Sequence, residues 1–570
     1  MRPFSLLVQA QARTRPSGAC ARAFFQPPCS KYGHPRHIHN GPRDTVKSHP
    51  HPDEFSFERL GLRSSVLTAL RLAFPSIKHP TPIQHRFIDA VLKGQDVLLK
   101  DKTGTGKSFA AILALLSQKR ASGPVTSLVV VPHRDLAYQL FHWIERIHHH
   151  MTPQDPLPSL AQVFVRNSST SLEEQLTAIR HSSPQILIGT PQALLDAVQE
   201  DPEALPLSKL STVVVDEVDY LVKTVPILKD KIAMQKIERK VNRHPGPTRL
   251  LLDHIYSGAN QGPYREQKAS AARPQLVLMS ATLRNHLRRF LLTDSGWFNT
   301  ESGKLVRITG EVSPHNPRKE QATTSEVEDS AAETVGGLNV QHHVIVVSED
   351  GDIANIVGAV DAPAVSSEES QAETSSDTPL ELPPLPESSQ APDIDQAIDT
   401  PSPFNPNALE AIAAAFALDV PSVGLLVLPS DAPVQRAAYD LRLLGVNARA
   451  LDVVKDETGR VHLMRQNFDI AAENPTLLVS TLASTRGLDL PELTHVFILG
   501  LLDNGAVDSY LHVAGRVGRF GRSGRVISVV ADRHEVLRDN GRKASRDEPR
   551  MMEGLLRKVG ITPTRFEHFE

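Results

Sequence analysis

The stretch Lys102-Thr103-Gly104-Thr105-Gly106-Lys107-Ser108 decides which fold we expect for the first half of the chain. It lies between two apolar runs, Val97 to Leu99 and Phe109 to Leu116, which predict a strand before it and a helix after it. A glycine-containing turn that opens a helix directs several backbone N–H groups, and the positive end of the helix dipole, at one point. The stretch therefore predicts a phosphate-binding loop.

Two side chains of this loop suit a nucleoside triphosphate bound with magnesium. Lys107 can reach the β- and γ-phosphates, and the Ser108 hydroxyl can coordinate Mg²⁺. The full phosphate-loop pattern requires glycine at position 101, where this chain has Asp101. The shortened pattern leaves the assignment open, and the motifs farther along the chain decide it.

Length and composition limit the number of domains and the classes of protein to which the chain can belong. A chain of 570 residues has room for two or three domains, and 40% hydrophobic residues are enough for packed cores. No apolar stretch of about 18 residues marks a membrane span. Both cysteines, Cys20 and Cys29, lie near the start, so the rest of the chain has no disulfide framework and no cysteine metal site.

The beginning of the chain has the composition of a targeting segment. Before Asp44 it contains six arginines, one lysine and no acidic residue, together with the apolar residues Phe4, Leu6 and Leu7. This pattern predicts a mitochondrial transit peptide over residues 1–45, and hence a location in the mitochondrial matrix. The alternative is a basic tail that binds RNA without specificity, but such a tail does not need the apolar residues.

A second motif precedes the phosphate loop. The segment Pro80-Thr81-Pro82-Ile83-Gln84 holds a glutamine whose amide donates and accepts at once, as the N6/N7 edge of adenine requires. Taken alone, the segment is also typical of a proline-rich turn before a helix.

Four further strand-like runs each end at a polar motif. They are Ser127 to Val131 before Pro132–Ala137, Gln185 to Ile188 before Gly189-Thr190-Pro191, Thr212 to Val215 before Asp216–Asp219, and Gln275 to Met279 before Ser280-Ala281-Thr282. Strands that alternate with helical segments predict a doubly wound parallel sheet, whose ligands gather at the carboxyl ends of the strands. Each motif is therefore expected at that edge.

The acidic pair Asp216-Glu217 has a task opposite a phosphate loop. Asp216 can hold Mg²⁺ through water, and Glu217 can orient or deprotonate the attacking water. A single acidic pair at a strand end is usually a solvated turn, but four such motifs in order argue against that interpretation.

The second half repeats the alternation. Its predicted elements are strands at Leu338 to Val347, Gly424 to Leu428 and Thr476 to Val479, and a helix at Asn407 to Leu418. Ser480 to Asp489 and Tyr510 to Arg519 follow as polar motifs. Arg516 and Arg519 lie three residues apart, and both can reach across a cleft to the γ-phosphate as arginine fingers.

In order and spacing, these motifs resemble those of the DEAD-box ATP-dependent RNA helicases of superfamily 2, most closely the divergent fungal mitochondrial members linked to large-ribosomal-subunit assembly. The resemblance implies an α/β fold of two tandem RecA-like domains with parallel doubly wound sheets. The implied domains are 53–300 (with the Q motif at 57–84) and 338–540, with a linker at 301–337, a disordered acidic insertion at about 349–405 and a C-terminal tail at 541–570.

The resemblance also implies the cofactors ATP and Mg²⁺ and a set of site residues. ATP binding is implied for Phe57, Gln84, Thr103, Gly104, Thr105, Gly106, Lys107, Ser108, Asp489, Arg516 and Arg519. Catalysis is implied for Glu217, Asp216, Lys107, Arg516 and Arg519, and metal binding for Ser108 and Asp216. RNA contacts are implied for Arg134, Thr190 and Thr481, and coupling between the sites for Ser280, Thr282, Asp219 and His512.

The chain departs from the family pattern at several positions. Asp101 and Lys102 replace alanine and glutamine, and Gln192-Ala193 replaces Gly-Arg. Leu482 replaces an aspartate and Val513 an arginine, where ATP and RNA binding are coupled. These two motivate an alternative to the helicase: an ATP-switched RNA clamp with little or no turnover.

Two stretches of biased charge leave alternatives open. Residues 223–273 hold eleven basic and four acidic residues, which suits either an RNA contact or a solvated helix and loop. Residues 349–399 hold thirteen acidic residues, which suits a spacer, a competitor of RNA or a site for a partner.

The expected partner is RNA, contacted through its backbone, with mitochondrial ribosomal RNA and assembly proteins as candidates. We expect a monomer without membrane insertion. A DNA translocase is disfavoured because the Q motif and Asp216-Glu217-Val218-Asp219 match the RNA branch.

Overall fold

The computed structural model describes most of the chain after residue 55. The described residues are 56–118, 125–152, 155–166, 170–201, 205, 207, 210–225, 231–257, 273–301, 303–310, 340–361, 401–451, 475–490, 493–504, 506–518, 523–537 and 543–569. The predicted transit peptide, most of the predicted linker and residues 362–400 of the predicted acidic insertion lie outside them.

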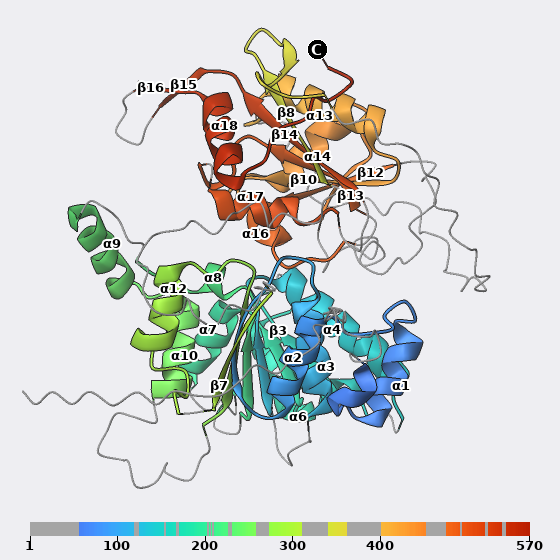
Figure 1. Ribbon diagram of the computed structural model, residues 1–570, viewed down its shortest axis with the longest axis vertical. Coiled ribbons are helices and arrows are strands. Elements are labelled where there is room, and N and C mark those ends of the chain that lie inside the picture. Colours follow the sequence, from blue (N-terminus) through green and yellow to red (C-terminus); the bar gives the residue numbers. More distant parts are fainter. Residues whose placement is uncertain are drawn as a thin grey trace, which may run out of the picture. The chain divides into compact units, whose positions relative to one another are not determined.

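The first domain is built on a seven-stranded sheet in which every pair of neighbours is parallel (Figure 1). Its strands are β1 (Asp96–Lys100), β2 (Ser127–Val130), β3 (Ala161–Phe164), β4 (Ile186–Gly189), β5 (Thr212–Val215), β6 (Gln275–Ser280) and β7 (Leu305–Thr309). Their order in space is β3-β4-β2-β5-β6-β1-β7. The predicted doubly wound parallel sheet is confirmed.

Helices cover both faces of this sheet. The helical elements of the first domain are η2 (Phe57–Leu60), α1 (Ser64–Ala73), α2 (Pro82–Leu92), α3 (Lys107–Ser117), α4 (Arg134–His149), α5 (Leu157–Leu160), α6 (Leu172–Ser182), α7 (Pro191–Glu200), α8 (Val218–Leu221), α9 (Lys231–Arg243), α10 (Pro247–Ser257), α12 (Asn285–Arg289) and the π-helical turn η4 (Phe290–Asp294).

Successive strand residues alternate between two hydrophobic cores because neighbouring side chains of a strand point to opposite faces. Val97 and Leu99 of β1 pack with the helices α1 to α4, whereas Leu98 packs with α6, α7 and α10. The strands are therefore buried on both faces, as a sheet with helices on each side requires.

The second domain repeats this architecture. Its strands are β8 (Val340–Val347), β9 (Ile353–Asn355), β10 (Val423–Leu428), β11 (Ala448–Ala450), β12 (Thr476–Thr481), β13 (Leu493–Leu499) and β14 (Gly524–Ala531). They lie in the order β11-β12-β10-β13-β14-β8-β9, parallel throughout except that β9 is antiparallel to β8. Its other elements are α13 (Pro406–Asp419), α14 (Val434–Leu443), α16 (Leu482–Thr485), η6 (Leu502–Asn504), α17 (Val507–Ala514), α18 (Glu548–Val559) and a separate hairpin, β15 (His534–Leu537) with β16 (Lys543–Arg546).

The same alternation builds two cores here. Leu425 and Val427 of β10 pack with α17 and α18, and Leu426 and Leu428 pack with α13 and α14. Both predicted α/β domains are thus present.

Three expected boundaries differ from the structure. The expected linker begins at 301, yet β7 pairs with β1 and belongs to the first sheet. The expected acidic insertion begins at about 349, yet β9 pairs with β8 and Ile356 is buried. Both strands are short edge strands of mixed exposure, so the apolar pattern that marks a buried strand is weak in them.

The expected C-terminal tail is the third difference. Helix α18 buries Met552, Leu555 and Leu556 in a core of the second domain, and Phe566 is fully buried in the other core. The amphipathic spacing in 548–559 is a signal for this helix that the sequence interpretation did not use.

Candidate nucleotide site and its contacts with the second domain

The strand order of the first sheet separates the predicted functions along its carboxyl edge. Strands β1, β6 and β5 are neighbours, so the phosphate loop, the Ser280–Thr282 motif and the acidic pair follow adjacent strands. Strands β2 and β4 are neighbours as well, and the residues predicted to touch RNA, Arg134 and Thr190, follow them. The fold thus places the predicted nucleotide residues and RNA residues side by side along one edge.

The phosphate loop has the backbone that glycines permit. Gly104 and Gly106 both have a φ of +77°, in the left-handed region that other residues rarely adopt. A Cβ atom at Gly106 would also collide with the side-chain nitrogen of Gln84. The loop can therefore take its shape only with glycine at position 106.

Gln84 connects the helix α2 to this loop. Its Oε1 accepts the backbone N–H of Thr81 (3.0 Å), which forms half of a capping box at the start of α2. Its Nε2 donates to the backbone oxygens of Thr105 and Gly106, at 3.2 Å each. The glutamine predicted to recognise adenine therefore also fixes the position of the phosphate loop.

Lys107 is retracted into its own loop. Its Nζ donates to the backbone oxygens of Asp101 (2.9 Å) and Lys102 (2.6 Å), and the residue is 7% exposed. Burial lowers the pKa of Lys107, while the carboxylates of Glu217, Asp101 and Asp216 act in the opposite direction. The ammonium group is thus held by neighbours that a phosphate group would have to replace.

The two residues predicted to hold Mg²⁺ are in direct contact. The Ser108 hydroxyl donates to Oδ2 of Asp216, whose Oδ1 accepts the backbone N–H of Glu217 (3.0 Å). Burial, and next the nearby Glu217 carboxylate, raise the pKa of Asp216 to about 6. A hydroxyl and two crowded buried carboxylates form an oxygen donor set, which fits a Mg²⁺ ion.

Glu217 has strained backbone and a free carboxylate oxygen. Its φ of 53° lies in the left-handed region, which is uncommon outside glycine and is found at functional sites. Its Oε2 is buried and has no hydrogen-bond partner among the described residues. Nδ1 of His512 lies 3.8 Å from this oxygen. The residue predicted as the general base is therefore available to bond a water molecule.

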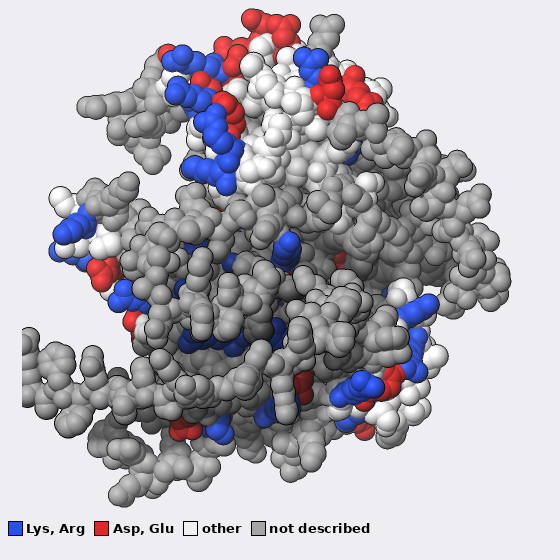
Figure 2. Space-filling view, viewed as in Figure 1, with Lys and Arg blue, Asp and Glu red and all other residues white. Residues whose placement is uncertain are grey.

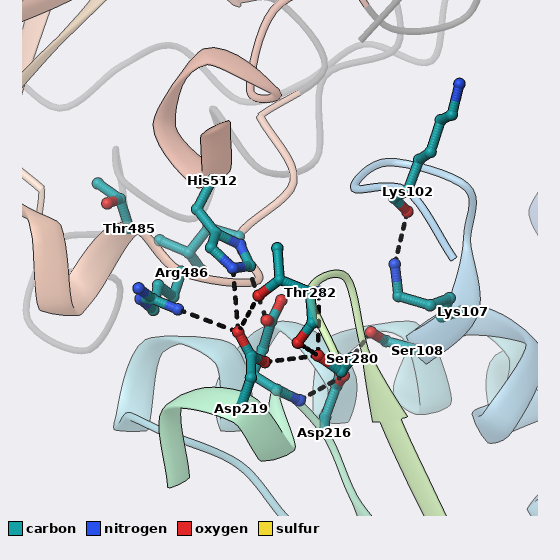
Figure 3. Close-up of polar contacts among 12 residues, drawn as sticks. Lys102, Lys107, Ser108, Asp216, Asp219, Ser280, Thr282, Thr485, Arg486 and His512 are labelled. Atoms are coloured by element: carbon teal, nitrogen blue, oxygen red, sulfur yellow. Dashed lines mark hydrogen bonds and ion pairs between the residues drawn. The ribbon is translucent and has the colours of Figure 1, made fainter. Parts of the chain in front are cut away.

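Asp219 brings the predicted coupling residues together (Figure 3). It accepts hydrogen bonds from Ser280 Oγ (2.8 Å), Thr282 Oγ1 (2.6 Å) and His512 Nε2 (3.3 Å). Burial opposes ionisation of this carboxyl, but the bonds from His512 and Thr282 and the charge of Arg486 outweigh it and hold its pKa below the usual range. Ser280 and Thr282 belong to the first domain and His512 to the second, so one carboxylate bonds groups from both.

The predicted arginine finger Arg516 is buried in the second domain. Its Nε donates to the backbone oxygen of His512 (3.0 Å), and its Nη1 donates to that of Leu488. Arg516 is close enough to Lys107 for its charge to lower the pKa of that lysine. Arg519 lies outside the described residues.

Several predicted residues occupy structural positions. Phe57 is 3% exposed in the first core, and Asp489 pairs through its backbone with the side chain of Gln139 (2.8 and 3.1 Å). Thr103 has a buried hydroxyl without a hydrogen-bond partner among the described residues, and Thr105 Oγ1 donates to the Lys102 oxygen (3.0 Å). Adenine and ribose contacts of Phe57 and Asp489 remain predictions.

The predicted RNA residues all lie at the carboxyl ends of strands. Arg134 is the first residue of α4, and Thr190 precedes the first residue of α7 without a capping hydrogen bond from its side chain. Thr481 caps α16, where its Oγ1 accepts the N–H of Ser484 (3.3 Å). Their positions agree with the predicted edge, and their RNA contacts remain predictions.

Three residues of this region were missed. Gln139 bonds Asp489 as described above, the His133 ring contacts the Arg486 backbone oxygen, and the Arg486 guanidinium lies 3.8 Å from Asp219. All three fall inside or next to the quoted motifs. No sequence pattern could show that residues more than 250 positions apart would meet.

The basic stretch after the acidic pair forms an exposed helix in part. Lys236, Arg239, Lys240 and Arg243 of α9 are exposed, and Figure 2 shows blue side chains at the place of this helix. Residues 226–230 and 258–272 of this stretch lie outside the described residues. Both alternatives for the stretch therefore stand.

Within the part of the chain that the structure describes, no helix has both the length and the apolar character that a membrane crossing requires.

Comparison with protein families identifies the class. Residues 81–290 match the DEAD/DEAH box helicase family, and residues 429–521 match the helicase conserved C-terminal domain. Together the two ranges span more than half of the chain, and each carries the motifs described above. The chain belongs to the DEAD/DEAH box helicases and is an ATP-hydrolysing RNA helicase.

Among individual relatives, the mitochondrial translation ATP-dependent RNA helicase mrh5 of Schizosaccharomyces pombe is 24% identical, and the match covers 90% of this chain and 85% of that one. The DEAD-box ATP-dependent RNA helicase RhpA of Helicobacter pylori is 32% identical, but the match takes in only 35% of this chain and 36% of that protein. The structure of S. cerevisiae Dbp5 bound to RNA and ADP BeF3 has the same fold, with a TM-score of 0.53 at 16% identity over 90% of this chain and 95% of that one.

Proposed function

We propose that this helicase uses ATP and Mg²⁺ to remodel RNA or RNA–protein complexes in the mitochondrial matrix, in the assembly of the large ribosomal subunit. The observation that carries the chemistry is the meeting of Ser108, Asp216 and Glu217 beside the phosphate loop. The coupling of this chemistry to RNA rests on the Asp219 carboxylate, which bonds groups from both domains.

In this proposal each residue has one task in hydrolysis. Lys107 leaves the two loop oxygens and bonds the β- and γ-phosphates. Ser108 and Asp216 would hold Mg²⁺, which would neutralise phosphate charge when bound. Glu217 accepts a proton from the attacking water, and Arg516, with Arg519, stabilises the charge that develops on the γ-phosphate.

RNA is held without a base code. Arg134, Thr190 and Thr481 lie at strand ends, where they would contact phosphates and 2′-hydroxyls. A strand gripped by both domains is bent, which separates a short duplex, and hydrolysis then releases it. RNA-stimulated ATP hydrolysis and unwinding of a short duplex by the purified protein test this step. If the purified protein unwinds a DNA duplex as well as an RNA duplex, the proposed recognition of RNA through its 2′-hydroxyls is wrong.

The mitochondrial assignment has two supports. One is the start of the chain, which has arginines and no acidic residue before Asp44. The other is similarity to a fission-yeast helicase of mitochondrial translation. Crosslinking of the tagged protein to RNA in cells tests it, and we expect ribosomal RNA of the mitochondrial large subunit. Recovery of cytosolic or nuclear RNA alone would refute the assignment.

A second function is favoured by one specific observation. Leu482 and Val513 are 2% and 1% exposed in a core of the second domain, so they offer no polar group for coupling ATP to RNA. An ATP-switched RNA clamp needs binding but little turnover. Retention of RNA with a non-hydrolysable ATP analogue, combined with no RNA stimulation of steady-state hydrolysis, would support the clamp over the helicase.

A further inference from the structure

Asp101 places a buried carboxylate at the base of the phosphate loop. It follows β1 directly, and its backbone N–H donates to the oxygen of Ser280 on the neighbouring strand (3.1 Å). The residue is 5% exposed. Its Oδ1 accepts the backbone N–H of Lys102 (2.9 Å), and its Oδ2 has no hydrogen-bond partner among the described residues. One half of this carboxylate is thus left unsatisfied inside the protein, which is costly for a buried polar atom.

The position of this carboxylate is fixed by the fold. Gly310, at the end of β7, lies so close that a Cβ atom there would collide with Oδ1 of Asp101. The backbone N–H of Gly310 donates a hydrogen bond to the backbone oxygen of Lys100 (3.0 Å). Oδ1 of Asp101 therefore packs directly against the backbone of Gly310, where only a glycine leaves room for it.

The same residue holds the ammonium group that phosphates need. Nζ of Lys107 donates to the backbone oxygen of Asp101, and the Asp101 carboxylate adds a favourable charge interaction with that ammonium. Two other carboxylates, Asp216 and Glu217, share this environment. Those two have tasks in hydrolysis, whereas the proposed chemistry does not use Asp101.

We propose that Asp101 determines nucleotide affinity. Its carboxylate stabilises Lys107 in the retracted position and repels incoming phosphates. Removal of its charge therefore tightens nucleotide binding, and the gain in affinity increases with the number of phosphates. This inference rests on the proposed nucleotide site. A unit charge within about 10 Å of a phosphate charge, at an effective dielectric constant of about 20, changes affinity by roughly tenfold or more.

The test is equilibrium binding of AMP, ADP and a non-hydrolysable ATP analogue, each with Mg²⁺ and without RNA, to the full-length protein. Asp101→Asn keeps the shape and removes the charge. We expect roughly tenfold tighter binding of the ATP analogue, a smaller gain for ADP and little change for AMP. Asp101→Ala, which leaves no amide to satisfy, should give the same order, and thermal unfolding checks that both variants fold.

Asp96 offers a matched control on the same strand. It is equally buried at the opposite end of β1, and its carboxylate accepts the N–H groups of Leu276 and Asn299 (2.7 Å each) and pairs with Arg273 (3.3 Å). Asp96→Asn should lower thermal stability and leave all three affinities unchanged.

The outcomes separate this inference from the proposed function. If the wild-type protein binds the ATP analogue and the Asp101 variants bind it no more tightly, the inference alone is overturned. The same holds if the variants gain equal affinity for AMP, ADP and the ATP analogue. Failure of the wild type and both variants to bind any of the nucleotides would overturn both the inference and the proposed function.

Discussion

At the carboxyl ends of its strands, the first sheet buries acidic side chains beside a lysine, whereas the second sheet buries apolar side chains beside arginines and a histidine. At the first sheet, Lys107, Asp216 and Glu217 are each at most 7% exposed, yet they lie close enough to influence one another's charge. At the second sheet, the corresponding motifs bury Leu482 and Val513 among apolar neighbours. Buried charge persists only where opposite charge or hydrogen bonds compensate for lost hydration.

The difference indicates how the work is divided. The first domain holds a preassembled group of ionisable side chains, while the second supplies a packed support from which His512 and Arg516 reach that group. Changes in the first sheet should therefore affect chemistry, and most changes in the second should affect stability. Arg516 is the exception, because it belongs to the second domain and is proposed to act in the chemistry.

Arg516→Ala should have the largest effect. We expect single-turnover hydrolysis with saturating RNA to fall roughly 10³-fold, because an arginine finger acts mainly on the transition state. Nucleotide affinity should change little. Arg557→Ala, which removes an arginine that is 76% exposed in the same domain, is the control and should hydrolyse ATP normally. Loss of less than tenfold would show that Arg516 only supports the fold around Leu488.

Glu217→Gln should rank second. The change keeps the shape but removes the base, so hydrolysis should fall by about 10²-fold or more while ATP and RNA still bind. Nucleotide affinity and single-turnover rates measure the two properties separately. If the wild type hydrolyses no faster than this variant, the first sheet is a binding device and the clamp hypothesis replaces the helicase.

Much of the fold follows from the sequence because buried parallel strands have continuous apolar runs. Thr212 to Val215 was predicted with the bounds that β5 has, and β6 and β12 were each predicted to within two residues. The edge strands β7 and β9 escaped prediction because they bury few side chains and hydrogen bonds along one edge determine them. The central strands β13 and β14 were not predicted either, although both are buried. The local hydrophobic pattern of a sequence indicates which residues are buried, but it does not indicate which distant residues they contact.

The site divides in the same way. The contact between Ser108 and Asp216 could be expected, because their motifs follow strands at one edge of a parallel sheet. The buried carboxylate of Asp101 could not be derived, since it depends on Gly310 more than 200 positions later. Nor could the bonds between Gln139 and Asp489, which join the two domains.

Leu482→Ala tests whether the apolar residues of the second sheet's motifs serve stability. Leu482 is 2% exposed, so its truncation should lower the free energy of unfolding by roughly 2 kcal/mol through lost burial and a cavity. Urea unfolding of the full-length protein measures this, with Leu443→Ala as the control because Leu443 is 70% exposed. A stable Leu482→Ala protein with altered RNA-stimulated turnover would place Leu482 in the functional site instead of the core.

The smallest predicted effect comes from a polar cluster in the second domain that has no part in the proposed chemistry. At the end of α13, the Asp419 carboxylate accepts a hydrogen bond from His495 Nε2 (2.9 Å), and Nη1 of Arg525 lies 2.8 Å from both its oxygens. Burial opposes ionisation of this carboxyl, but the bonds and charges of His495 and Arg525 outweigh it and lower its pKa to about 2.

Because the folded pKa lies below the unfolded value of about 3.9, ionised Asp419 stabilises the fold above pH 4 and loses that effect as the pH falls from about 4 to 2. Asp419→Asn should therefore lower the free energy of unfolding by about 1 kcal/mol at pH 7, after allowance for partial solvent screening. Urea unfolding at pH 7 and pH 3 should show this deficit shrinking at the lower pH, and Asp350→Asn, at an exposed position, should show none at either. A deficit that stays constant between the two pH values would mean that hydrogen-bond geometry, and not the charge of Asp419, ties α13 to β13 and β14.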